Sequence, residues 1–425
     1  MSNIQPKINV FIINDANGWN NINNFSLRDI NIYLITKDLD IQNNKTLDLT
    51  NSVIIGVVDD AEIEPIPVID NCHTYYIPPN VSVSPILPGY FIKNRNNTNI
   101  LPELKGYKCY VRFINFSNPL FNVIDTSTTG FLKFTSQNDI TTTTNGAILA
   151  SVVLINSIIK SISLECNHNI FIKFFGQNFI GNGLFIGYNR GVVIDSELQV
   201  KNAKSITVIG AIIGGFVGIN DVNGVIENCH SIIKNNAEVH LISVTDFING
   251  GFIGLNESVV SNCTLNMCNN KKINIISKLE DGQTDYGNPI CAGFVGYELN
   301  GQTINNNLNI TNNDVIEFDS ALTASGFGAG GGGNIIHNNS LFKHNKLIKI
   351  ISKNTIVSDF AYADGFVTAL NINTLIVNNV SRFIDNDTIE IKGKNATNFI
   401  SNNANNAPYN KSYIKCNKFF DVISR

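Results

Sequence analysis

The C-terminal two-thirds of the chain repeat variants of one stretch, Gly214-Gly-Phe-Val-Gly-Ile-Asn-Asp-Val-Asn-Gly-Val-Ile-Glu-Asn-Cys-His-Ser231. Each variant places a phenylalanine one or two residues after a glycine, at Phe185, Phe216, Phe252, Phe294, Phe327 and Phe366. Self-similarity at this period indicates a repeat architecture, in which each unit covers the apolar face of its neighbour.

Each unit contains two further strand signals. An aliphatic-x-Asn triplet follows the phenylalanine, as in Ile226-Glu227-Asn228, and a strictly alternating run such as 239–243 comes after it. Alternation with a period of two is typical of β-strands, and no window sustains helical periodicity. The sequence therefore predicts an all-β protein, a right-handed parallel β-helix with three short strands per coil, the hand following the general preference of parallel crossovers.

The repeated residues have physical roles in such a coil. The six phenylalanines are expected to stack on one another inside the tube, where loss of one side chain costs about 3–5 kcal/mol. Asparagine at a corner tolerates left-handed backbone geometry, and stacked amides can pair along the axis. The predicted corner ladder consists of Asn228, Asn262, Asn306, Asn338 and Asn378.

These units resemble the GLUG motif, a repeat of adhesin-like parallel β-helix proteins on bacterial surfaces. The resemblance rests on 214–231 and is repeated at 251–263 and 293–306, within a region covering about residues 140–420. It implies the β-helix architecture and a surface or adhesive function. The composition, in which about one residue in six is Asn, also resembles the virion and fibre proteins of amoeba-infecting giant viruses.

Composition narrows the classes of partner. The 425 residues carry a net charge of −4 with no cluster of Lys and Arg, which gives no electrostatic footprint for nucleic acid. We expect no membrane insertion, no cofactor and no metal site. The N-terminus lacks the pattern of a secretory signal, and the eight widely spaced cysteines favour reduced thiols. Synthesis in a reducing cytoplasm is expected, with a virion or a cell surface as the final location.

Three regions are predicted along the chain. Residues 1–58 contain strand-like runs and are expected to form an N-terminal cap. Residues 59–107 begin with a cluster of acidic residues and hold most of the prolines, so they are expected to form an irregular excursion or a small head. Residues 108–425 form the β-helix and its C-terminal cap.

Chemistry is expected where the repeat varies most in length. The two longest loops, 279–291 and 353–364, belong to coils separated by one coil, and they would flank a groove. Its walls would carry Asp281, Asp285 and Tyr286 on one side and Asp359, Tyr362 and Asp364 on the other. Paired carboxylates suit glycoside hydrolysis and tyrosines suit sugar stacking. The four aspartates are thus alternative catalytic candidates, and Tyr286, Tyr362, Asp281 and Asp364 are candidate ligand-binding residues.

The sequence supports three functions. The first is a non-enzymatic structural protein that displays loops to a partner, with a glycan or a host surface as the candidate, in a fibre, virion or adhesin-like assembly. The second is a carbohydrate-active enzyme, a glycoside hydrolase or lyase, on the same scaffold. The third is a passive subunit that self-associates through its open ends, and threefold fibres make a homotrimer the expected form.

Overall fold

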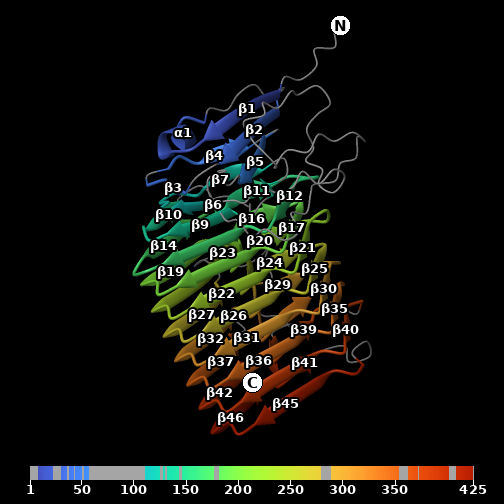
Figure 1. The fold of residues 1–425 in the computed structure, drawn as a ribbon. Coiled ribbons are helices and arrows are strands. Elements are labelled where there is room, and N and C mark those ends of the chain that lie inside the picture. The colour runs from blue at the N-terminus through green and yellow to red at the C-terminus, as the bar shows by residue number, and fades with distance from the viewer. Residues whose placement is uncertain are drawn as a thin grey trace, which may run out of the picture.

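The structure, a computed structural model, describes residues 8–22, 30–35, 38–42, 44–49, 52–56, 111–124, 128–129, 132–142, 146–176, 181–278, 289–353, 362–371, 373–401 and 408–424. Strands dominate this part of the chain, and its only α-helix is the short α1 (Ala16–Asn20). All strand pairs are parallel, and equivalent strands of successive coils stack side by side along a rod (Figure 1). The predicted all-β parallel β-helix is confirmed.

The coils build four parallel sheets, which we call sheets A to D. Sheet A contains β1 (Ile8–Ile13), β2 (Ile30–Ile35), β5 (Ser52–Gly56), β8 (Thr128–Thr129), β12 (Ile158–Lys160), β17 (Val192–Ile194), β21 (Val225–Glu227), β25 (Val259–Ser261), β30 (Gln302–Ile304), β35 (Asn334–Ile336) and β40 (Leu375–Val377). Sheet B contains β3 (Leu39–Asp40), β6 (Val111–Ile114), β9 (Leu132–Ser136), β13 (Ser163–Asn167), β18 (Glu197–Lys201), β22 (His230–Lys234), β26 (Thr264–Cys268), β31 (Asn307–Thr311), β36 (Asn339–Lys343), β41 (Val380–Ile384) and β45 (Lys411–Lys415).

Sheet C holds the strands that start at or next to the repeated phenylalanines. It contains β4 (Leu47–Leu49), β7 (Phe121–Ile124), β11 (Ala150–Val153), β16 (Ile186–Asn189), β20 (Val217–Asn220), β24 (Ile253–Asn256), β29 (Val295–Glu298), β34 (Gly328–Gly330), β39 (Val367–Ala369) and β44 (Ile400–Ser401).

Sheet D has a main row and a shorter second row. The main row contains β10 (Ile140–Thr142), β14 (Phe171–Phe175), β19 (Ser205–Gly214), β23 (Glu238–Gly250), β27 (Lys272–Ser277), β32 (Val315–Ser320), β37 (Leu347–Ser352), β42 (Thr388–Gly393) and β46 (Phe419–Ser424). The second row contains β15 (Asn182–Gly183), β28 (Ile290–Ala292), β33 (Thr323–Ser325), β38 (Tyr362–Asp364) and β43 (Asn395–Thr397), and it joins the main row through the second halves of β19 and β23.

One coil therefore passes through four sheets rather than the three strands predicted. From β20 the chain turns into β21, then β22, then β23, and returns to sheet C at β24. Sheet B was missed because its outward positions are mostly polar and its inward positions include serines, such as Ser231 and Ser340, so its apolar alternation is weak. The strands of residues 8–56 join sheets A, B and C and pair with later strands.

The two ends of the rod differ. At the N-terminal end, Trp19 of α1 is fully buried, and its ring lies 6.0 Å from that of Phe121. The side chain of Asp15 accepts a hydrogen bond from the backbone N–H of Gly18 and so caps α1. At the other end β45 and β46 are the last strands of sheets B and D (Figure 1).

Candidate functional site

The structure describes only two of the predicted groove residues. Asp281, Asp285, Tyr286 and Asp359 lie outside the described residues, so their placement stays a prediction. Tyr362 and Asp364 both lie in β38, where Tyr362 is 7% exposed and Asp364 is fully buried.

Asp364 is therefore not exposed on one side of a groove, contrary to the expectation from the sequence. It sits in the second row of sheet D, in register with Ser325 of the preceding coil and Thr397 of the following coil. The hydroxyls of Thr368 and Thr397 both donate to its carboxylate, the latter over 2.6 Å. These bonds connect neighbouring strands and coils, so the carboxylate serves an internal contact of the scaffold.

The repeated phenylalanines form a continuous stack inside the tube. Phe185, Phe216, Phe252, Phe294, Phe327 and Phe366 are fully buried, and successive rings are nearly parallel with centroids 4.6, 4.7, 4.8, 5.0 and 5.0 Å apart. The stack continues from Phe366 to Phe399 at 5.4 Å. The spacing matches that of strands in a sheet, because each ring belongs to the residue just before the equivalent sheet C strand of its coil.

The asparagines predicted as one ladder occupy two different corner positions. Asn228, Asn262 and Asn378 are exposed and have positive φ values of 52°, 55° and 53°. Asn306 and Asn338, by contrast, are fully buried and bond to each other. Three of the five predicted ladder members are therefore wrong, and the buried residue is the next one along the chain. Each corner has a residue with left-handed backbone geometry followed by a buried residue.

With this correction the first ladder lies at the corner between sheets A and B. It runs through Asn306, Asn338, Asn379 and Asn410, while Cys229 and Cys263 hold the same place in earlier coils. Both cysteines are buried free thiols. Burial raises the pKa of the Cys263 thiol well above its usual value, which keeps it protonated and unreactive.

A longer ladder, which the sequence analysis missed, lies at the corner between sheets B and D. We call it the corner ladder; its members are Asn236, Asn270, Asn313, Asn345, Asn386 and Asn417. Each of the first five follows the same scheme. For Asn345, the backbone N–H and Nδ2 donate to Oδ1 of Asn386 at 3.0 and 2.9 Å, and Nδ2 also donates to the carbonyl of Ile310 at 2.9 Å.

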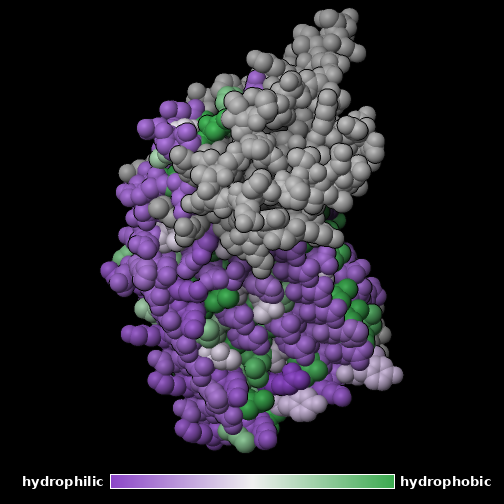
Figure 2. Space-filling model, in the orientation of Figure 1, coloured by the Kyte–Doolittle hydropathy of each residue, from purple (hydrophilic) through white to green (hydrophobic). Residues whose placement is uncertain are grey.

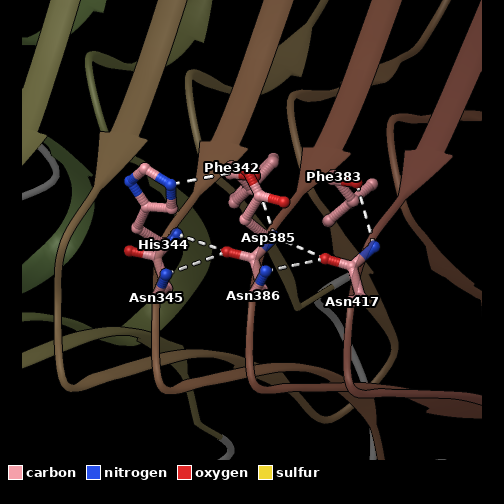
Figure 3. Close-up of polar contacts among 7 residues, drawn as sticks. All are labelled: Phe342, His344, Asn345, Phe383, Asp385, Asn386 and Asn417. Carbon is pink, nitrogen blue, oxygen red and sulfur yellow. Dashed lines mark hydrogen bonds and ion pairs between the residues drawn. The ribbon is translucent and has the colours of Figure 1, made fainter.

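Figure 3 shows the C-terminal end of this ladder, where Asn345, Asn386 and Asn417 stand in line. The residue before each buried asparagine again has positive φ, as in Asn312, His344 and Asp385. His344 and Asp385 lie 3.4 Å apart on the outside of the corner. Pairs such as Asn235-Asn236, Asn269-Asn270 and Asn312-Asn313 are the sequence signal that could have revealed it.

A third internal row ends in a carboxyl group. Asn189, Asn220 and Asn256 bond amide to amide at 2.8 Å, and Nδ2 of Asn256 donates to Oε1 of Glu298 at 2.8 Å. Glu298 is fully buried and also accepts a hydrogen bond from the Thr303 hydroxyl. Desolvation by burial raises the pKa of Glu298 to about 8, although the hydrogen bonds from Thr303 and Asn256 oppose the shift.

Charges on the outer surface also repeat along the axis. Asp314, Lys346, Asp387 and Lys418 are equivalent residues of successive coils; Lys346 contacts Asp314 at 2.7 Å and Lys418 contacts Asp387 at 2.7 Å. These pairs are exposed and contribute little stability individually. Figure 2 shows that the described residues on this face of the rod are mainly hydrophilic.

Comparison of the chain with protein-family models, with curated proteins and with solved structures finds no match. In the part of the chain that the structure describes, no group of three or more His, Cys, Asp or Glu side chains could hold a metal ion. Among the same residues, no helix is long and apolar enough to cross a membrane.

Proposed function

We propose that the protein is a non-enzymatic structural rod that holds loops along one edge for a partner. Its setting would be a fibre, a virion or an adhesin-like surface assembly, and a glycan is the candidate ligand. The observation that carries the proposal is the corner ladder, because it links six successive coils by buried amide hydrogen bonds along the axis.

A ladder of this kind stabilises the rod against opening between coils. To separate two coils, buried donors and acceptors must lose their partners, at about 1–3 kcal/mol for each group left unsatisfied. The phenylalanine stack crosses the same coil boundaries, so both networks resist the same motion. A rigid and slowly unfolding rod suits a protein that works as a structural support.

Two of the described carboxylates, Asp364 and Glu298, also favour a structural function over hydrolysis. A glycoside hydrolase needs two carboxyl groups that face a bound sugar, roughly 5–9.5 Å apart. Asp364, the one groove aspartate that the structure describes, is buried and bonded to Thr368 and Thr397. Glu298 is likewise engaged inside the coil by Asn256 and Thr303.

Exchanging the long loops tests the proposal. Residues 279–288 and 354–361 would each be replaced by a two-residue Asn-Gly turn, and the wild type and both variants screened on a glycan array. We expect the variants to lose binding while their circular dichroism and melting temperature remain those of the wild type.

The same preparations give the result that would contradict the proposal. Release of reducing ends or unsaturated sugars by the wild type, abolished in a folded Asp364→Asn variant, would establish an enzyme instead. Asp319→Asn is the matched control, since Asp319 lies in the neighbouring row of sheet D.

A further inference from the structure

Among the described residues, the last coil of the rod has a free strand edge. Of the described strands, β45 pairs only with β41 and β46 only with β42. Ile414 and Val422 are in register with the fully buried Phe383 and Ile391, yet they are 39% and 36% exposed. No described element lies beyond them, and an open parallel edge of this kind is a template for a further strand.

The corner ladder also ends at this coil. Its last member has the donor groups that earlier members use to bond the next coil. Oδ1 of Asn417 accepts from the backbone N–H and Nδ2 of Asn386 at 2.9 Å, and its own Nδ2 donates to the carbonyl of Phe383. In each earlier member of the ladder, the backbone N–H and Nδ2 also donate to an oxygen of the next coil (Figure 3). An added strand with a carboxamide or carboxylate oxygen there would continue the pattern.

The net positive charge of the C-terminal end favours binding of an acidic strand. Residues 408–424 carry Lys411, Lys415 and Lys418 against Asp421, a net charge of +2 (three minus one), whereas the whole chain has −4. Lys418 is the last residue of the alternating row of Asp and Lys, so the next place in that row calls for an acid.

The first residues of the predicted 59–107 excursion, before its prolines begin, form a segment of matching chemistry. In residues 60–64, Asp60, Glu62 and Glu64 alternate with Ala61 and Ile63. β45 alternates in the same way, because Lys411, Tyr413 and Lys415 face outward while Ser412 and Ile414 take inward positions. When the segment pairs parallel to β45 over five residues, Asp60 and Glu64 lie beside Lys411 and Lys415. Ile63 then lies beside Ile414, over the exposed part of the core.

The segment cannot reach the C-terminal edge of its own molecule. Glu64 follows Gly56, the last residue of β5, by eight residues, which span at most about 29 Å. In sheet A, eight strand spacings separate β5 from β40, or roughly 38 Å, and β45 belongs to a later coil still. The donor of the strand must therefore be a second molecule.

We propose that the open edge of β45 binds the acidic segment 60–64 of a second copy as an added strand, so that copies join head to tail. The contact is heterologous, since it joins the C-terminal edge of one copy to a segment that follows β5 in the next, and such a head-to-tail contact favours open filaments over trimers. This inference rests on the proposed structural function and specifies how the rods assemble.

The first test is the concentration dependence of assembly, measured by sedimentation velocity and electron microscopy on the 425-residue chain. Lys411→Glu/Lys415→Glu should raise the concentration for half assembly roughly tenfold or more. Lys201→Glu/Lys234→Glu is the matched control, because these lysines occupy the same outward column as Lys415 in the middle of the rod, and it should assemble as the wild type does.

The second test exchanges the charges. Asp60→Lys/Glu64→Lys alone should also weaken assembly, and combined with Lys411→Glu/Lys415→Glu it should restore it. A labelled peptide of residues 57–66 should bind the wild type and cap its filaments.

Three results would overturn the inference. They are a wild type that stays monomeric at all concentrations, discrete trimers, and assembly that is indifferent to the charge of Lys411 and Lys415. A monomer that still binds glycan through its long loops would overturn this inference alone and leave the proposed function standing.

Discussion

Glu298 occupies the place that asparagine holds in the three preceding coils, and it makes the stability of the rod depend on pH. Its pKa is about 8 in the folded state against 4.5 for the free side chain, so folding favours the protonated form. The resulting stability is fully present below pH 4.5 and is lost as the pH rises through 8, at up to about 1.4 kcal/mol per pH unit. We expect Glu298→Gln to flatten this slope in guanidinium unfolding at pH 5, 7 and 9. Glu238→Gln, an exposed control, should keep it.

At the same scale, the two residues of each corner should respond differently to substitution. Asn313→Ala removes a buried amide that bonds to Met267, Asn270 and Asn345, and we expect it to lower the free energy of unfolding by about 3 kcal/mol. Asn312→Gly should change it by less than about 0.5 kcal/mol, because Asn312 has a φ of 57° that glycine adopts freely. Equal effects of the two substitutions in denaturant titrations would contradict the corner geometry.

At the scale of the element, the phenylalanine stack should behave as a row of equivalent members. Phe294→Ala removes a ring that stacks on Phe252 at 4.8 Å and Phe327 at 5.0 Å, and we expect a loss of about 3–5 kcal/mol. Phe399→Ala should cost less, since Phe399 is only partly buried at the end of the row. The difference between the two variants is measurable as a difference in denaturation midpoint. A larger effect at Phe399 than at Phe294 would show that the row is not cooperative.

The elements also show how far sequence reasoning reaches. The phenylalanines were identifiable because a large apolar residue after glycine at a fixed period has one physical use in a coil, namely the core. The asparagine ladders were only partly predictable, because left-handed and buried positions both favour Asn and the two stand next to each other, as in Asn305-Asn306. Sheet B was not predicted because serines and asparagines weaken its alternation. The burial of Asp364 depends on the second row of sheet D, which no periodic pattern marks.

At the scale of the whole molecule, the four sheets and the internal ladders make one cooperative rod. Contacts between neighbouring coils follow a similar scheme along the rod, so opening at one point exposes partners in the adjacent coil. We expect slow unfolding and resistance of the region 181–278 to chymotrypsin, which can cut the long loops after Tyr286 and Phe360. Proteolysis followed by mass spectrometry should place the early cuts in the long loops rather than within sheets B or D.

The buried asparagine ladders should hold the coils together along the axis, and amide hydrogen exchange measures this for each coil. We expect the corner segments around Asn236, Asn270, Asn313, Asn345 and Asn386 to exchange together and last, with protection that persists for days. Asn313→Ala should shorten the protection of the adjacent coils as well as its own. Exchange of these corners within minutes, or protection confined to isolated coils, would contradict the account.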